Sequence, residues 1–168
     1  MAIILAVDPG NVTGIAWYDT SHPEDKPEVE EIEGGLRGFV DWWDRNARYL
    51  NEDDSTFEVC IEDFIIRPDT HKKTREPAAY ETLGYVKGTC FAAGSTCYVY
   101  GPSEHTPFSA YKIRKASKLV RLGWSTPSKD MHADSATSVL LLHLVRRHPA
   151  VARKLLKEIV MVDDVTNG

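Results

Sequence analysis

Two acidic side chains follow stretches that are mainly apolar, at positions where they could bind a hard metal ion. Asp8 follows AIILAV at the start of the chain, and Glu62 follows FEVCI. Carboxylate oxygens are the ligands that hard divalent cations prefer. Two carboxylates that lie close together repel each other unless cations lie between them. Asp8 and Glu62 are therefore candidate metal ligands if the fold brings them together.

Hydrophobic periodicity predicts the elements that must position these acids. A turn at DPGN joins the first two strands as a hairpin. Three antiparallel strands followed by alternating helices and strands predict an α/β fold, with one five-stranded mixed sheet flanked by helices. We expect a single domain over residues 1–168. The predicted strands are 2–7, 12–18, 28–33, 57–62 and 97–100, and the predicted helices are 36–50, 77–93, 107–122, 130–147 and 149–161.

This order of elements matches the ribonuclease H-like fold, and the sequence resembles the RuvC-like Holliday junction resolvases. The resemblance rests on DPGNVTGIAW after an apolar strand and on IEDF at the end of the fourth strand. In that fold the first and fourth strands are parallel neighbours, about 4.8 Å apart. The resemblance therefore implies that Asp8 and Glu62 lie at adjacent carboxyl ends.

The resemblance also implies an activity. It implies a structure-selective DNA endonuclease that resolves four-way junctions by hydrolysing phosphodiesters. Two Mg²⁺ ions about 3.5 to 4 Å apart would activate the attacking water and the leaving oxygen, and Mn²⁺ would substitute for Mg²⁺. Symmetric cutting of a junction needs two active sites, so the resemblance implies a homodimer with branched DNA as its partner.

The family's further metal ligands come from the start of the last core helix, which here allows two interpretations. Asp130 and Asp134 are four residues apart on one helical face, with Cβ atoms about 5 to 6 Å apart. Alternatively, His132 and Ser135 occupy the HxxD pattern that some resolvases use, with the second acid missing. We favour Asp130 and Asp134 as metal ligands, because both are acids and their stripe continues into apolar residues. His132 is the alternative ligand.

Each of these acids also has an ordinary structural explanation. Asp8 could bond its own turn, and Glu62 could be a strand-end acid beside the real ligand, Asp63. Asp130 could cap its helix, and Asp134 could be a solvated acid favoured by the helix dipole.

Basic residues in the second part of the chain are candidate phosphate contacts. Phe64 could wedge between bases or pack in the core. A solvated helix face is the ordinary explanation for the basic segment 112–121. The candidate DNA-binding residues are Phe64, Arg67, Lys72, Lys73, Arg75, Lys112, Arg114, Lys115, Lys118 and Arg121.

The net charge of −5 hides an uneven distribution. Residues 1–63 carry 16 acidic and 4 basic residues, whereas residues 64–168 carry 9 acidic and 16 basic residues. DNA binding should therefore be confined to one face and weakened by salt.

Several classes of protein and site are not expected. The apolar stretches are too short for a membrane span, and the N-terminus does not resemble a signal peptide. Three cysteines without a CxxC pair indicate a reducing compartment, so we expect the cytoplasm, or a host's cytoplasm if the source is viral. The six histidines form no HExxH or other zinc spacing.

Three other functions fit parts of the sequence. A related nuclease could act on flaps or structured RNA with the same chemistry. A junction-binding protein with weakened or lost catalysis would fit the Ser135 interpretation. An actin-like ATPase or sugar kinase would need two such domains, for which 168 residues are too few.

Overall fold

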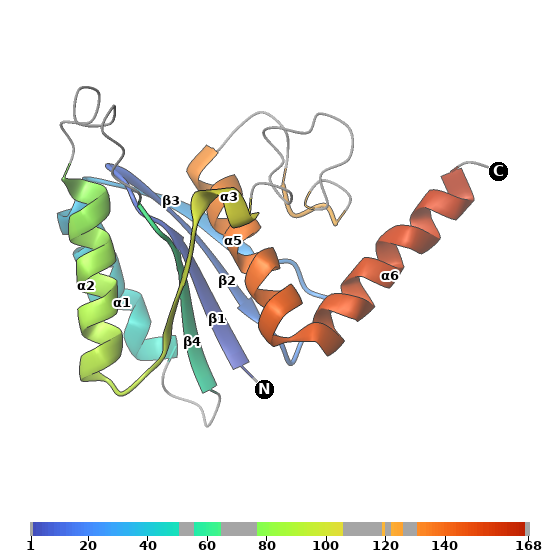
Figure 1. Ribbon diagram of the computed structural model, residues 1–168, viewed down its shortest axis with the longest axis horizontal. Coiled ribbons are helices and arrows are strands. Elements are labelled where there is room, and N and C mark those ends of the chain that lie inside the picture. Colours follow the sequence, from blue (N-terminus) through green and yellow to red (C-terminus); the bar gives the residue numbers. More distant parts are fainter. Residues whose placement is uncertain are drawn as a thin grey trace.

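The computed structural model describes residues 2–50, 56–64, 77–105, 119, 122–125 and 131–166. The strands are β1 (Ala2–Asp8), β2 (Val12–Asp19), β3 (Glu28–Glu33), β4 (Thr56–Glu62) and β5 (Cys97–Tyr100). The helices are α1 (Gly35–Leu50), α2 (Ala78–Ala92), α3 (Pro102–His105), α5 (Met131–Arg147) and α6 (Pro149–Thr166) (Figure 1).

The sheet is mixed and has five strands in the order β3-β2-β1-β4-β5. β1 pairs antiparallel with β2, and β2 pairs antiparallel with β3. β4 pairs parallel with β1 on one side and with β5 on the other. This topology confirms the predicted ribonuclease H-like sheet. In its register Val7 lies opposite Ile61, so β1 and β4 reach the same edge of the sheet together.

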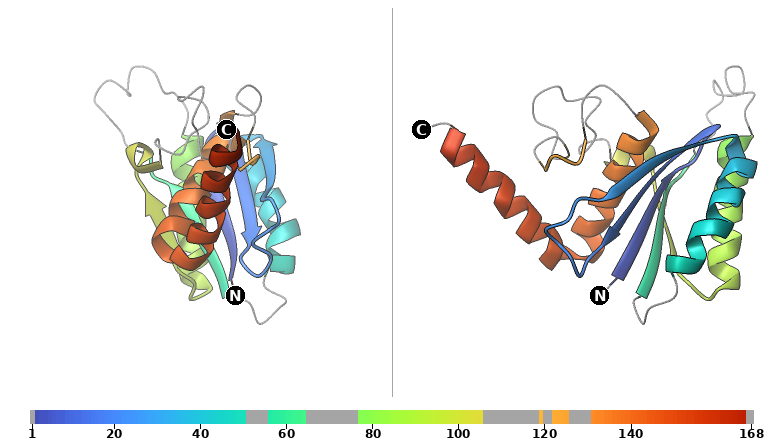
Figure 2. Two further views of the ribbon diagram at one scale, coloured as in Figure 1. Left: turned by 90° about the vertical axis from the view of Figure 1, so that its right-hand side faces the viewer. Right: turned by 180° about the vertical axis from the view of Figure 1, so that it is seen from behind.

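Helices cover both faces of the sheet (Figure 2). Alternate residues of β1 face opposite layers: Leu5 and Val7 pack in a cluster with residues of α1 and α2, whereas Ile4 and Ala6 pack in a cluster with residues of α5. A central strand that is buried on both faces needs apolar residues at every position, which explains the uniform AIILAV run. α6 leaves the end of α5 and projects away from the sheet (Figure 1).

The structure also refines the predicted elements. Trp42 and Trp43 are both buried in the cluster beneath α1. The short helix α3 is not predicted, because four residues are too few to show a helical period. The predicted helix 107–122 lies outside the described residues, except for Leu119 and Leu122.

Within the described part of the chain, no helix combines the length and apolarity needed to cross a membrane.

Candidate active site

Asp8 and Glu62 form the centre of the site, at the neighbouring ends of β1 and β4. Their side chains are only 14% and 16% exposed. Burial and the negative charge of Glu62 raise the pKa of Asp8 to about 7, although a hydrogen bond with His132 works in the opposite direction. A buried carboxylate whose ionisation is opposed by a second carboxylate favours bound cations.

The first turns of α5 bring two more side chains to this pair. His132 Nδ1 lies 3.0 Å from Asp8 Oδ2, and Ser135 Oγ donates a hydrogen bond of 3.3 Å to Glu62 Oε2. The hydrogen bond with Asp8 raises the pKa of His132 above its usual value. The residues of the HxxD-like pattern are therefore the ones that contact the two strand-end acids.

Asp134 lies on another side of α5. Its carboxylate accepts a hydrogen bond from Ser125 Oγ. It also lines a pocket with Val29, Trp124 and Thr137, and neither Asp8 nor Glu62 lines that pocket. Asp130, the other acid of the favoured pair, lies outside the described residues.

His105, in α3, is a site residue that the sequence does not reveal. Its side chain is 6% exposed, and Nε2 lies 3.2 Å from Glu62 Oε2. The contact lacks hydrogen-bond geometry, and neither ring nitrogen of His105 has a hydrogen-bond partner among the described residues. Burial alone would raise the pKa of Glu62, but the interactions with His105, Asp8 and Ser135 hold it below its usual value. The only sequence signal is a histidine just after the fifth strand.

Residues from β2 and β3 set the position of α5. A Cβ atom on Gly14 would lie 2.0 Å from the carbonyl oxygen of His132, so a residue without a side chain is needed for this close approach. Glu31 Oε1 accepts hydrogen bonds from the backbone N–H groups of His132 (2.9 Å) and Ala133 (3.2 Å). A carboxylate at a helix N-terminus accepts hydrogen bonds from free N–H groups, and its negative charge interacts favourably with the positive end of the helix dipole. Together, Gly14 and Glu31 fix the first turn of α5 against the sheet.

Of the candidate DNA-binding residues, the structure describes Phe64. Phe64 is half-buried, and its ring packs edge-to-face on Tyr80 with centroids 4.7 Å apart. The other candidates lie outside the described residues: Arg67, Lys72, Lys73, Arg75, Lys112, Arg114, Lys115, Lys118 and Arg121.

Solved structures share this architecture. RuvC of Thermus thermophilus in complex with a Holliday junction substrate is 18% identical with a TM-score of 0.58, over 87% of this chain and 96% of that one. A second Thermus thermophilus RuvC structure is 18% identical with a TM-score of 0.58, over 86% and 95% of the two chains. The fowlpox virus Holliday junction resolvase is 16% identical with a TM-score of 0.49, over 86% and 98%.

No protein-family model matches the sequence, and no curated protein matches it either. The similarity to the two Thermus thermophilus structures is therefore evidence about the fold alone. This chain has the ribonuclease H-like fold of RuvC-type resolvases.

Proposed function

We propose that the chain is a divalent-metal-dependent endonuclease that cleaves branched DNA, with four-way junctions as its substrate. The observation that carries the proposal is the partly buried pair Asp8 and Glu62 at adjacent strand ends, faced by His132 and Ser135. The Thermus thermophilus protein of the same fold was solved with a Holliday junction, which supports this choice of substrate.

The donor set fits hard divalent cations. Asp8 and Glu62 offer carboxylate oxygens, and the raised pKa of Asp8 indicates negative charge that the protein alone does not neutralise. When two such ions are bound, they supply an activated water and stabilise charge on the phosphoryl group. Mg²⁺ suits the carboxylates, and Mn²⁺ also accepts an imidazole such as His132.

The side chains around the pair orient it. Ser135 donates to Glu62, and His105 lies against the same carboxylate, so both restrain its rotation. His132 holds Asp8 through its Nδ1 contact and is itself held by the backbone hydrogen bond to Glu31. A ligand that is fixed before the ion arrives loses less conformational freedom on binding.

The remaining assignments follow from the same proposal. Symmetric cleavage of a junction needs two active sites, so we assign a homodimer. Junction cleavage of this kind would serve DNA recombination and repair in the cytoplasm. We assign phosphate contacts to the basic residues of 67–75 and 112–121, and contact with unstacked bases to Phe64.

A cleavage assay with matched substrates tests the proposal. With Mg²⁺, the protein should cut a four-way junction faster than a flap, a linear duplex or a structured RNA of the same sequence. Asp8→Asn should abolish cleavage and leave junction binding nearly intact, and binding should weaken as salt rises. Wild-type rates in Asp8→Asn would contradict the site, whereas faster cutting of flaps or RNA would contradict the substrate.

Ser135 favours a second candidate, a junction-binding protein with weakened catalysis. It contacts Glu62 from the position at which the HxxD pattern has an acid, and a neutral hydroxyl is a weaker metal ligand than a carboxylate. Junction binding without cleavage in either Mg²⁺ or Mn²⁺ would support this candidate.

A further inference from the structure

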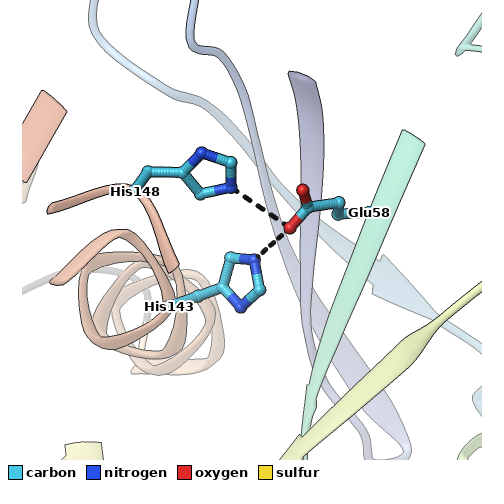
Figure 3. Close-up of side chains that lie close together, drawn as sticks. All are labelled: Glu58, His143 and His148. Carbon is cyan, nitrogen blue, oxygen red and sulfur yellow. Dashed lines mark hydrogen bonds and ion pairs between the residues drawn. The ribbon is translucent and has the colours of Figure 1, made fainter. Parts of the chain in front are cut away.

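A second cluster of metal-ligating side chains lies at the other end of α5. It consists of Glu58 on β4, His143 on α5 and His148 between α5 and α6 (Figure 3). His143 Nε2 lies 2.8 Å and His148 Nε2 lies 3.1 Å from the same oxygen, Glu58 Oε2. The His143 side chain is fully buried, whereas Glu58 and His148 are 15% and 19% exposed.

This cluster is separate from the candidate active site. Glu58 and Glu62 are four residues apart on the same face of β4, which corresponds to about 13 Å along the strand. His132 and His143 are eleven residues apart on α5, or about 16 Å along the helix. No single ion could contact both groups of residues.

We infer that Glu58, His143 and His148 together bind one divalent transition-metal ion, and that Zn²⁺ is the ion they fit best. Two imidazole nitrogens and one carboxylate oxygen form a donor set that Zn²⁺ accepts and that Mg²⁺ and Ca²⁺ do not favour. Tetrahedral ligands about 2.0 to 2.1 Å from Zn²⁺ lie roughly 3.3 Å from one another. The two nitrogen–oxygen distances of 2.8 and 3.1 Å need to open by only a few tenths of an ångström.

A neighbouring hydroxyl supports the metal-binding form of His143. Tyr100 Oη lies 2.8 Å from His143 Nδ1, on the opposite side of the ring from Glu58. In the metal-free protein a proton on Nε2 can bridge to Glu58 while Nδ1 accepts from Tyr100. When Nε2 binds an ion, that proton moves to Nδ1 and is donated to Tyr100 Oη. Outer hydrogen bonds of this kind hold the ring of a metal-binding histidine in the correct orientation.

The bound ion would fix the corner between α5 and α6. The backbone N–H of His148 donates to the Leu144 carbonyl at the end of α5, and that of Ala152 donates to the His148 carbonyl at the start of α6. His148 is therefore part of the junction from which α6 projects (Figure 1). Linking this residue to β4 through a metal would set the direction of α6 relative to the sheet.

Zinc binding to matched variants of the whole protein tests the inference. His148→Gln keeps an N–H donor for Glu58 but removes the imidazole ligand, so the metal-free fold should be preserved while zinc binding is lost. His22→Gln is the control, because His22 also contacts a carboxylate, Asp19, but is exposed. We expect the wild type and His22→Gln to bind one more equivalent of Zn²⁺ than His148→Gln, measured by competition with a chromophoric chelator. Co²⁺ should give a tetrahedral visible spectrum in the same two proteins only.

Two outcomes would overturn the inference. One is equal zinc stoichiometry and affinity in the wild type and His148→Gln, which would mean that zinc binds adventitiously elsewhere. If His148→Gln does not fold, Tyr100→Phe decides the question, because loss of the outer hydrogen bond should weaken zinc binding by roughly tenfold or more. Unchanged zinc affinity in folded Tyr100→Phe is the second refuting outcome.

Discussion

Replacing Asp8 by asparagine should stabilise the metal-free protein while removing its activity. The pKa of Asp8 is raised from 3.8 to about 7, first by burial and then by Glu62. Between these two pH values the folded chain retains a proton that the unfolded chain has lost. The free energy of unfolding therefore falls by about 1.4 kcal/mol for each pH unit as pH rises through this window. Above pH 7 it levels off.

The size of the effect follows from the same two pKa values. Compared with a side chain that does not ionise, Asp8 lowers the free energy of unfolding by about 2 kcal/mol at pH 5 and by about 4 kcal/mol at pH 8. Asparagine cannot ionise, yet its side-chain oxygen can still accept a hydrogen bond from His132. Asp8→Asn should therefore be more stable than the wild type, with a difference of roughly 10 °C in Tm at pH 8 for a chain of this size.

Thermal unfolding in EDTA from pH 5 to pH 8 measures this difference. Asp41→Asn, at an exposed position on α1, serves as the control and should shift Tm little at any pH. Adding Mg²⁺ should raise the Tm of the wild type and reduce the difference in Tm between it and Asp8→Asn, since ions that bind only the folded state stabilise that state. The reasoning would be refuted if Asp8→Asn were the less stable protein at pH 8, or if the difference did not grow with pH.

Three further variants test how the site is built. Ser135→Asp places a third acid beside Glu62, so we expect cleavage to become measurable at lower Mg²⁺ concentrations, and a higher Mg²⁺ requirement would argue against metal binding there. Gly14→Ala forces a methyl group against the His132 carbonyl, so the free energy of unfolding should fall by about 3 kcal/mol and cleavage should be lost. Chemical denaturation measures the first effect and the junction assay measures the second. Glu31→Gln keeps an acceptor for the α5 N-terminus but removes its charge, so a loss of about 1 kcal/mol in urea unfolding is expected, smaller at high salt; an unchanged stability at low salt would contradict the capping role.

The sheet could be predicted because its signals are local. AIILAV is an apolar stretch that ends at a turn, and FEVCI is apolar except for Glu58 and ends at an acid. These patterns indicate strands without any knowledge of tertiary contacts. The order of elements then matched one fold, and that fold makes β1 and β4 parallel neighbours. The proximity of Asp8 and Glu62 follows from the topology and needs no prediction of side-chain detail.

The side of α5 that faces the acids could not be predicted in the same way. The start of the helix offers Asp134 and His132 within three positions, and local sequence does not set the rotation of a helix about its axis. That rotation depends on Gly14, which allows close approach, and on Glu31, which accepts hydrogen bonds from the first turn. Both belong to strands more than a hundred residues earlier.

The sequence did not reveal two histidines that contact acids far away in the chain, for a related reason. His105 reaches Glu62 from a four-residue helix, and His143 reaches Glu58 across 85 residues of sequence. Spacing rules for metal sites detect ligands that lie close together in the chain. They do not detect ligands that a sheet and a helix bring together.

Two buried cysteines lie on opposite faces of the sheet, one beneath each layer of helices. Cys60 is fully buried on the β4 face beneath α5, whereas Cys90 is buried in the cluster beneath α1 and α2. Burial raises the pKa of the Cys60 thiol well above its usual value, so a thiol reagent can reach and modify it only when that layer opens. The labelling rate of Cys60 would thus measure how often α5 lifts from the sheet, and the rate of Cys90 would do the same for the opposite layer. Once the half-buried Cys97 has been replaced, Cys60 and Cys90 are therefore probes of local opening, one for each side of the sheet.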